Sequence, residues 1–262
     1  MRIAQTKFSD TQPALFVHEA IVLAVTSVKS SNSAVAGHSL GEYSALYAAG
    51  VMTFEDALEV VQLRANLMYE AGSKIPGTMV AIVGLEDDVV ATICTDLNGV
   101  DGHVIVPANY NSPGQVVISG SAEYVRECMP LFKERGAKIV KELQVSGAFH
   151  SPLLAEAEAG LAEKIRSTAF SNAIVPVYVN VSGEAVTDAS MLRDAAIRQL
   201  TSPVLWTTSL QNMWKSGITT FCEIGPGKVL QGLVKRTLSE AQLMGVDTLT
   251  DVLKLNGEGA SA

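Results

Sequence analysis

"AVAGHSLGEYSALYAAG", residues 34–50, decides the fold, because it contains the pattern of a strand, a sharp turn and a helix in that order. The apolar run that opens it predicts a short strand, and the Ala-, Leu- and Tyr-rich segment 40–49 predicts a close-packed helix ending at Gly50. Between them, residues 37–41 fit the G-x-S-x-G pattern with Ser39 at its centre. Ser39 is therefore a candidate nucleophile, and a helix cap is the alternative interpretation.

The two glycines of this pattern have a physical reason. A strand-to-helix turn strains the backbone of the serine and brings neighbouring backbone so close that larger side chains would collide. The serine hydroxyl is then exposed at the N-terminus of the helix, where the Leu40 backbone N–H can bind an oxyanion. We expect Leu40 to be the oxyanion donor.

Composition narrows the partners and the compartment. The net charge of −8, without a long Lys/Arg run, would repel a phosphate backbone and argues against a nucleic-acid partner. Three widely spaced cysteines, at positions 94, 128 and 222, favour a reducing compartment and no zinc or other metal. The longest apolar run, residues 14–25, contains a histidine and a glutamate and is too short to cross a bilayer. We expect a cytoplasmic monomer with no membrane partner.

The order of apolar patterns predicts an α/β core interrupted by an inserted lobe. Residues 1–75 and 147–255 form the core, and residues 256–262 are expected to be a disordered tail. Core helices are predicted at 12–28, 40–49, 53–70, 151–167, 191–200 and 228–239, and core strands at 34–36, 174–181 and 219–225. Within residues 76–146, strand-like and helical segments alternate in the order β-α-β-β-α-β, which is typical of a split βαβ module. A cleft is expected where the two lobes meet.

A serine nucleophile needs a base, and the chain contains four histidines. His38 is adjacent to Ser39, so its side chain leaves in another direction, while His18 lies in a helical pattern and His103 in a polar turn. His150 lies directly after the inserted lobe, so the chain can bring it back to the cleft; a structural residue at a helix start is the alternative. No Asp or Glu stands out as a third triad member, and a backbone carbonyl can orient the imidazole instead.

Arg64 interrupts an apolar stripe in the predicted helix 53–70, which is expected to stop near Gly72. No carboxylate lies three or four residues away on the helix, and a buried guanidinium without a partner is costly. One interpretation is that the side chain extends along the surface to reach water. The other is that its partner is a ligand carboxylate, which the two parallel donors of arginine suit.

Seven segments, in order along nearly the whole chain, resemble the malonyl-CoA:acyl carrier protein transacylases and the related acyltransferase domains of polyketide and fatty-acid synthases. They are TQPALF (11–16), AGHSLGEYSAL (36–46), VQLRANLM (61–68), ANYNSPGQVVISG (108–120), GAFHSPLL (147–154), RQLTSPVLWT (198–207) and EIGPGKVLQGLVKR (223–236). The resemblance implies a hydrolase-like α/β core with a central parallel sheet and a ferredoxin-like small lobe. It also implies ping-pong transfer of malonyl from coenzyme A to Ser39 and then to the phosphopantetheine thiol of acyl carrier protein. No permanently bound cofactor is expected.

By the same resemblance, His150 is the base and the Gln199 backbone carbonyl orients it. Arg64 binds the malonyl carboxylate, and His38 and Asn111 lie at the substrate site. Phe149 matches the malonyl-type form of its motif, where its bulk leaves little room for a 2-methyl branch. These roles are expectations from matched motifs.

One departure from the family pattern concerns the oxyanion hole. Members begin with a strand and a G-Q-G loop, whose Gln supplies a second oxyanion N–H, several dozen residues before the region that matches TQPALF. Only ten residues precede that region here, without G-Q-G. This predicts a gap in the central sheet and weakened activity.

Two alternative functions therefore stay open, a serine esterase or thioesterase and an inactive truncated remnant. For an acidic carrier protein, the basic residues Lys228, Lys235 and Arg236 are candidate contacts, and ordinary charges of a helix are the alternative.

Overall fold

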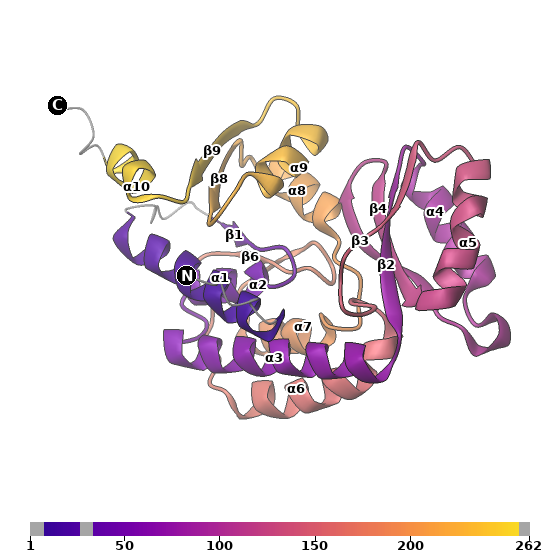
Figure 1. The fold of residues 1–262 in the computed structure, drawn as a ribbon. Helices are drawn as coiled ribbons and strands as arrows, with labels where there is room; N and C mark the ends of the chain where they lie inside the picture. Colours follow the sequence, from indigo (N-terminus) through magenta and orange to yellow (C-terminus); the bar gives the residue numbers. More distant parts are fainter. Residues whose placement is uncertain (1–7, 27–33, 257–262) are drawn as a thin grey trace, which may run out of the picture.

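The computed structural model describes residues 8–26 and 34–256, and in them the chain forms two lobes (Figure 1). The larger lobe holds the two ends of the described chain, and the smaller lobe, at the right in Figure 1, is one continuous insertion. The predicted tail at 257–262 lies outside the described residues, whereas Asn256 is described and its Nδ2 donates to Val25 O at 3.0 Å.

The larger lobe contains two short β-sheets. The first has the order β1-β6-β7, in which β1 (Val35–Ala36) and β6 (Val177–Tyr178) are parallel and β7 (Ala185–Val186) is antiparallel to β6. The second pairs β8 (Thr220–Ile224) with β9 (Gln242–Val246) in parallel. The expected central parallel sheet is therefore divided in the described chain: each part contains one parallel pair, and the antiparallel strand β7 extends the first part.

A cavity of about 1070 Å³ lies where the expected sheet is divided. Residues of β1 and β8 line it together with the C-terminal half of α1 and with Trp206. Since β1 and β8 are each at the edge of their own sheet, they do not pair with each other across this space. The division agrees with the gap in the central sheet that the sequence predicts.

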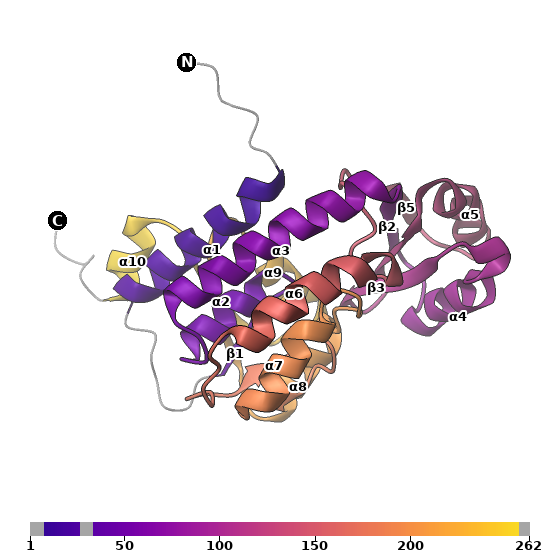
Figure 2. The same ribbon diagram turned by 90° about the horizontal axis from the view of Figure 1, so that it is seen from below.

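Helices surround these sheets, and α1, α3 and α6 lie side by side in Figure 2. The bounds are α1 (Phe8–Val25), α2 (Gly41–Ala48), α3 (Phe54–Lys74), α6 (Ala155–Ser167), α7 (Ala189–Arg198), α8 (Trp206–Lys215), α9 (Val229–Thr237) and α10 (Leu249–Leu255). A short 3₁₀ turn, Pro152–Leu154, precedes α6. Apolar side chains from α1, α2, α3, α6 and α7 form the main core between the helices and the β1-β6-β7 sheet.

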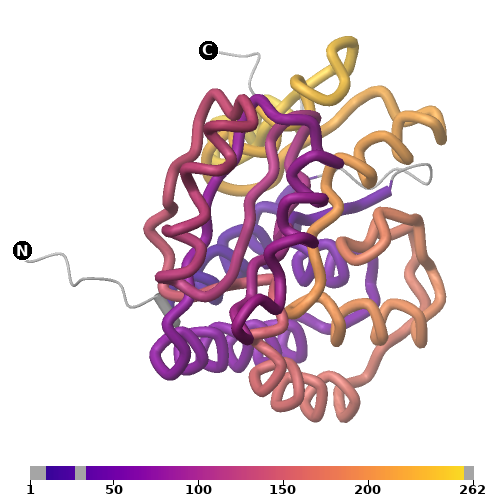
Figure 3. The backbone as a smooth tube through the Cα atoms, turned by 90° about the vertical axis from the view of Figure 1, so that its right-hand side faces the viewer, coloured from indigo at the N-terminus to yellow at the C-terminus, as the bar shows by residue number. Residues whose placement is uncertain are grey.

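The small lobe is a four-stranded antiparallel sheet with two helices on one face. Its elements are β2 (Gly77–Val83), α4 (Asp87–Leu97), a 3₁₀ turn (Val100–Gly102), β3 (Ile105–Ser112), β4 (Gln115–Ser121), α5 (Ala122–Glu134) and β5 (Ile139–Glu142). The sheet order is β3-β4-β2-β5. Figure 3, viewed from this lobe's side, shows α4 and α5 on the outer face of the sheet. The edge strand β3 contacts α8 and α9 of the larger lobe.

Most predicted elements agree with these bounds, and four were missed. The segments that form β7, α8, β9 and α10 were not assigned from the sequence. The predicted end of a helix near Gly72 is wrong, because α3 continues to Lys74. Gly72 is instead a point of close approach: a Cβ there would lie 2.0 Å from Ser146 O.

Candidate active site

Ser39 lies on the turn that joins the C-terminal end of β1 to the start of α2. Its φ of +53° falls in the left-handed region that non-glycine residues rarely adopt. Gly37 has no room for a side chain, since a Cβ would come 1.8 Å from the backbone of Gly41. The backbone N–H of Leu40 makes no hydrogen bond among the described residues. It is therefore available to an incoming oxyanion at the N-terminus of α2.

His150 lies on the chain that returns from the small lobe, also with a positive φ, of +56°. Its Nε2 is 2.8 Å from Ser39 Oγ, and its Nδ1 is 2.9 Å from the carbonyl oxygen of Gln199. A carbonyl oxygen can only accept, so Nδ1 carries the proton and Nε2 of the neutral ring accepts the Ser39 hydroxyl. Burial, and secondly the positive charge of Arg64, lowers the pKa of His150 to about 3. At neutral pH the serine hydroxyl is therefore hydrogen-bonded to the neutral imidazole of His150, whose Nε2 carries no proton.

Arg64 lies on the buried face of α3 and is 1% exposed, so the prediction that it extends to water is wrong. Its Nη2 donates to Ser39 Oγ at 2.9 Å and to Gln199 Oε1 at 3.1 Å, and its Nη1 donates to Gln12 Oε1 at 2.5 Å. The idea that Arg64 has no internal partner is also wrong. The amide oxygens of Gln12 and Gln199 come from segments distant in sequence, so helical spacing could not reveal them. Both amides are neutral, so neither neutralises the charge of the guanidinium group.

Sequence reasoning missed several residues around Ser39. Gln12 lies within TQPALF, so the motif contained it without indicating its contact with Arg64. For Gln199 only the backbone was considered, whereas the side-chain Nε2 also donates to Ser39 O at 2.8 Å. Asn180 and Glu42 are buried beside the turn and were given no role. No local pattern distinguishes them from other polar residues at strand or helix ends.

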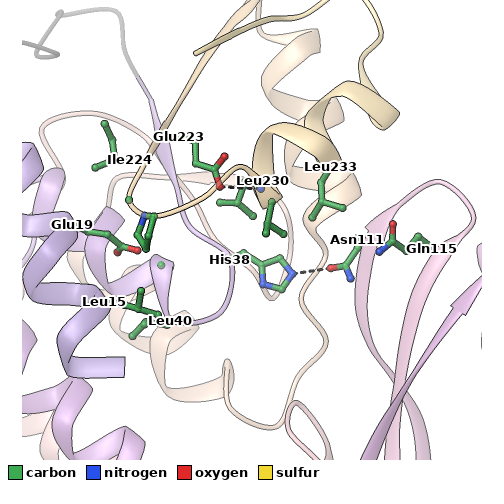
Figure 4. Close-up of a pocket in the computed structure, with 14 residues that line it drawn as sticks. Leu15, Glu19, His38, Leu40, Asn111, Gln115, Glu223, Ile224, Leu230 and Leu233 are labelled. Carbon is green, nitrogen blue, oxygen red and sulfur yellow. Dashed lines mark hydrogen bonds between the residues drawn. The ribbon is translucent and has the colours of Figure 1, made fainter. Parts of the chain in front are cut away.

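A pocket of about 320 Å³ opens next to the Ser39 turn and is bounded by both lobes (Figure 4). His38 and Leu40 line it from the larger lobe, and Asn111 and Gln115 line it from the small lobe. His38 Nε2 lies 2.8 Å from Asn111 Oδ1, as the dashed line in Figure 4 shows, and burial lowers the pKa of His38. Phe149 is not among the lining residues; it is buried in the main core.

The candidate carrier contacts lie at one side of this pocket. Lys228, Lys235 and Arg236 are exposed on or directly before α9, whose Val229 and Leu230 line the pocket. Arg236 Nη1 donates to Gln115 Oε1 at 2.5 Å, which joins the two lobes across the pocket edge.

The sequence model of the acyl transferase domain matches residues 4–261. The chain belongs to the acyl transferase domain family. It is 40% identical over 261 residues to the malonyl CoA-acyl carrier protein transacylase of Staphylococcus aureus (strain MRSA252), covering 95% of this chain and 84% of that relative. A protein of the same name from Haemophilus influenzae is 39% identical over 249 residues, with 94% and 78% covered.

Solved structures of acyl transferases agree with this fold. An acyl carrier protein S-malonyltransferase from Vibrio cholerae superposes with a TM-score of 0.89 at 40% identity, covering 95% of this chain and 81% of that one. A malonyl-transacylase in complex with its type II PKS acyl-carrier protein superposes with a TM-score of 0.88 at 36% identity, covering 96% and 81%. At these identities the likeness extends beyond the α/β fold to the family itself.

The described residues contain neither a cluster of metal ligands nor a membrane-spanning helix. No group of three or more His, Cys, Asp or Glu side chains there could hold a metal ion. In the same part of this acyl transferase domain, no helix is both long and apolar enough to cross a membrane.

Proposed function

We propose that this protein is a malonyl-CoA:acyl carrier protein transacylase that works through an acyl-enzyme on Ser39. The observation that carries the proposal is the position of Ser39 Oγ, 2.8 Å from His150 Nε2 and 2.9 Å from Arg64 Nη2. One hydroxyl thus contacts both a neutral base and a buried cation. This pairing suits an acyl donor that has an electrophilic carbonyl and a carboxylate a short distance apart.

In the first half-reaction, Ser39 Oγ attacks the thioester carbonyl of malonyl-CoA while His150 Nε2 takes its proton. The Leu40 N–H binds the oxyanion of the tetrahedral intermediate. When the intermediate collapses, the C–S bond breaks and His150 returns the proton to the departing coenzyme A sulfur. The phosphopantetheine thiol of acyl carrier protein then attacks the Ser39 ester by the same steps in reverse, which regenerates the serine.

Arg64 gives this site its preference for a malonyl group. Its hydrogen-bond partners in the described chain are a hydroxyl and two neutral amides, so a substrate carboxylate can replace Gln12 or Gln199 and gain a charged hydrogen bond. We propose that His38 and Asn111 line the path of the acyl and pantetheine groups. Phe149 is proposed to limit the space for the acyl group through the packing behind the site.

The finer description of the fold belongs to the same proposal. We assign the larger lobe to a hydrolase-like core and the small lobe, with its β3-β4-β2-β5 order, to a ferredoxin-like subdomain. The strand–turn–helix around Ser39 supports the first assignment, and the two helices on one face of the antiparallel sheet support the second. We also place the protein in the cytoplasm, since its three cysteines are free thiols.

Intact-protein mass spectrometry after mixing with malonyl-CoA tests the function. We expect one malonyl group on Ser39, its transfer when holo acyl carrier protein is added, and no adduct on Ser39→Ala. Stoichiometric release of free malonate without an acceptor would instead show a serine esterase or thioesterase. No adduct on a folded wild-type protein would favour an inactive remnant.

A further inference from the structure

The side chain of Asn180 contacts the backbone of the Ser39 turn, and Asn180 is 0% exposed. It lies just after β6, and because β6 is parallel to β1, the chain after both strands emerges at the same edge of the sheet. Its Oδ1 accepts the Ser39 N–H at 2.8 Å, and its Nδ2 donates to Gly37 O at 2.7 Å. One amide therefore bridges the backbone on both sides of His38.

Asn180 is itself held firmly. Its backbone N–H donates to Glu42 Oε2 at 2.5 Å, and its carbonyl oxygen accepts from Leu205 N–H at 2.9 Å. Glu42 is in the first turn of α2, three residues after Ser39, so the same turn that Asn180 bridges also reaches back to fix Asn180. All the polar groups of this residue are used, and its amide has little freedom to rotate.

The two peptide planes that flank Ser39 are therefore fixed by two different side-chain amides. Asn180 Oδ1 holds the peptide before Ser39 by accepting the Ser39 N–H. Gln199 Nε2 holds the peptide after Ser39 by donating to Ser39 O at 2.8 Å. A trans peptide is planar, so its C=O and N–H point in opposite directions. Fixing the Ser39 carbonyl thus fixes the direction of the Leu40 N–H, the oxyanion donor.

This clamp also stabilises an unfavourable backbone. In the left-handed region the Cβ of a non-glycine residue comes too close to the following carbonyl oxygen, and such a residue relaxes unless its surroundings hold it. The same contacts keep the hydroxyl of Ser39 aimed at His150. Without the Asn180 amide, the peptide before Ser39 would be free to turn.

We propose that Asn180 is a positioning residue for the reaction: by holding the peptide before Ser39 it aims the nucleophile, and together with Gln199, which holds the Ser39 carbonyl, it fixes the turn that presents the Leu40 N–H. The inference rests on the proposed function, because it assumes that Ser39 is acylated. Asn180 does not contact the acyl group, so its loss reduces turnover and leaves substrate binding largely unchanged.

The test measures kcat and KM for malonyl-CoA in the full chain, with holo acyl carrier protein as acceptor. We expect Asn180→Ala to lower kcat about 10- to 100-fold, with KM for malonyl-CoA within about threefold of wild type. Asn212→Ala is the matched control, because Asn212 Nδ2 also donates to a backbone carbonyl, Gly183 O at 3.0 Å, without contacting the Ser39 turn. We expect it to leave both constants unchanged.

A second probe separates this inference from the proposed function. A fluorophosphonate forms a bond between phosphorus and Ser39 Oγ and releases fluoride, and its oxygen occupies the oxyanion position, so it requires no transacylase activity. If wild type reacts with the probe but transfers no malonyl, the proposed function fails, while slower labelling of Asn180→Ala still supports the positioning role.

Three outcomes would overturn the inference. They are wild-type kcat in folded Asn180→Ala, a rise in KM with kcat unchanged, and equal labelling rates for the two proteins. Asn180→Ser, which keeps more of the side-chain volume but cannot bridge Ser39 N and Gly37 O, is measured in parallel. If circular dichroism shows that both variants are unfolded, Asn180 is a folding residue and the positioning role is rejected.

Discussion

At the scale of single residues, the environment of Arg64 shows how the site can select an anion. A buried cation is normally balanced by a carboxylate, yet the hydrogen-bond partners of Arg64 are the side chains of Gln12, Gln199 and Ser39. The nearby Glu42 carboxyl has its pKa raised to about 7 by burial, so it is only partly ionised at neutral pH. The guanidinium charge is thus left largely for a ligand to neutralise.

Arg64→Ala should therefore change selectivity more than general activity. A hydrogen bond to a charged group contributes about 1.5–3 kcal/mol, so we expect kcat/KM for malonyl-CoA to fall about 10- to 100-fold, and acetyl-CoA to be affected far less. Arg193→Ala is the control, because Arg193 is half-buried against the Phe170 ring, 5.1 Å away, and outside the site. Equal losses for the two substrates would show that Arg64 has only a structural role.

The lowered pKa of His150 predicts an unusual pH profile. The base acts only when neutral, so activity is lost as pH falls through the folded-state pKa, which burial and Arg64 move from 6.5 to about 3. We expect kcat/KM to stay level well below pH 6.5, and Arg64→Ala to move the acid limb to higher pH. Stopped-flow acylation from pH 8 to 4.5 measures this, on protein checked for folding at each pH.

Two further substitutions give the controls for that profile. His103 is exposed on the small lobe, so His103→Gln should leave the acid limb in place. A limb near pH 7 that disappears in Glu42→Gln would belong to Glu42. A limb near 6.5 that persists in Glu42→Gln would contradict the lowered pKa of His150.

What the sequence revealed at this scale depended on local pattern. Ser39 was predicted as the nucleophile from its strand–turn–helix context and His150 as its base from its position after the inserted lobe, and the structure places their side chains 2.8 Å apart. The partners of Arg64 and the Asn180 contacts were not predictable in this way. They join residues between 25 and 143 positions apart, and one sequence contains no signal of such contacts.

At the scale of elements, the long helix α3 does two jobs. It presents Arg64 to the site, and near its C-terminal end Gly72 lets the chain at Ser146 and Gly147 pass closely. That chain leads to His150 three residues later. The position of His150, the proposed base, thus depends on Gly72, a helical residue without a side chain.

Gly72→Ala should therefore destabilise the protein, although Ala is the better helix former. The added Cβ would lie 2.0 Å from Ser146 O, and overpacking of this kind costs about 1–3 kcal/mol. Gly232→Ala, in the exposed helix α9 with open space around it, should stabilise by about 0.5–1 kcal/mol. Denaturant unfolding compares the two, and acylation rates should fall only in Gly72→Ala. A stabilising effect at both positions would contradict this packing.

The element boundaries show why Gly72 was misinterpreted. A glycine near the end of a periodic pattern usually marks a helix C-cap, as it does at Gly50, whose φ is +71°. At Gly72 the same residue serves a tertiary contact that the local pattern does not contain. The strand β9 was missed for another reason: it is mostly exposed and lacks a clear apolar run, so its pattern does not predict a strand.

At the scale of the whole molecule, the candidate site lies where the two lobes meet. The small lobe supplies Asn111 and Gln115 to the pocket, and the larger lobe supplies His38 and Leu40, which flank the proposed nucleophile Ser39. The alternation of patterns in the sequence predicted an inserted lobe, and the departure from the family pattern predicted a gap in the central sheet. Which strands pair on each side of that gap was not predictable, because strand pairing depends on which segments lie side by side.

Charge also acts at this scale. With a net charge of −8, the protein as a whole repels an acidic carrier at long range. Lys228, Lys235 and Arg236 form a basic edge beside the pocket, and this edge can attract a carrier locally. Arg236 also holds Gln115 of the small lobe, so its charge lies at the junction of the lobes.

Reversal of the basic edge, all three residues to Glu, should raise KM for holo acyl carrier protein about tenfold and leave the first half-reaction with malonyl-CoA nearly unchanged. The reason is that carrier docking needs the local attraction, whereas Ser39 acylation depends on buried groups. The matched control reverses Lys133, Arg135 and Lys138, which are exposed on the small lobe, do not line the pocket and give the same change in net charge. Transfer assays over a range of salt concentrations distinguish the two variants, because the lost attraction should fade as salt screens it. Equal effects of both reversals would mean that total charge, and not the position of the basic edge beside the pocket, governs the encounter with the carrier.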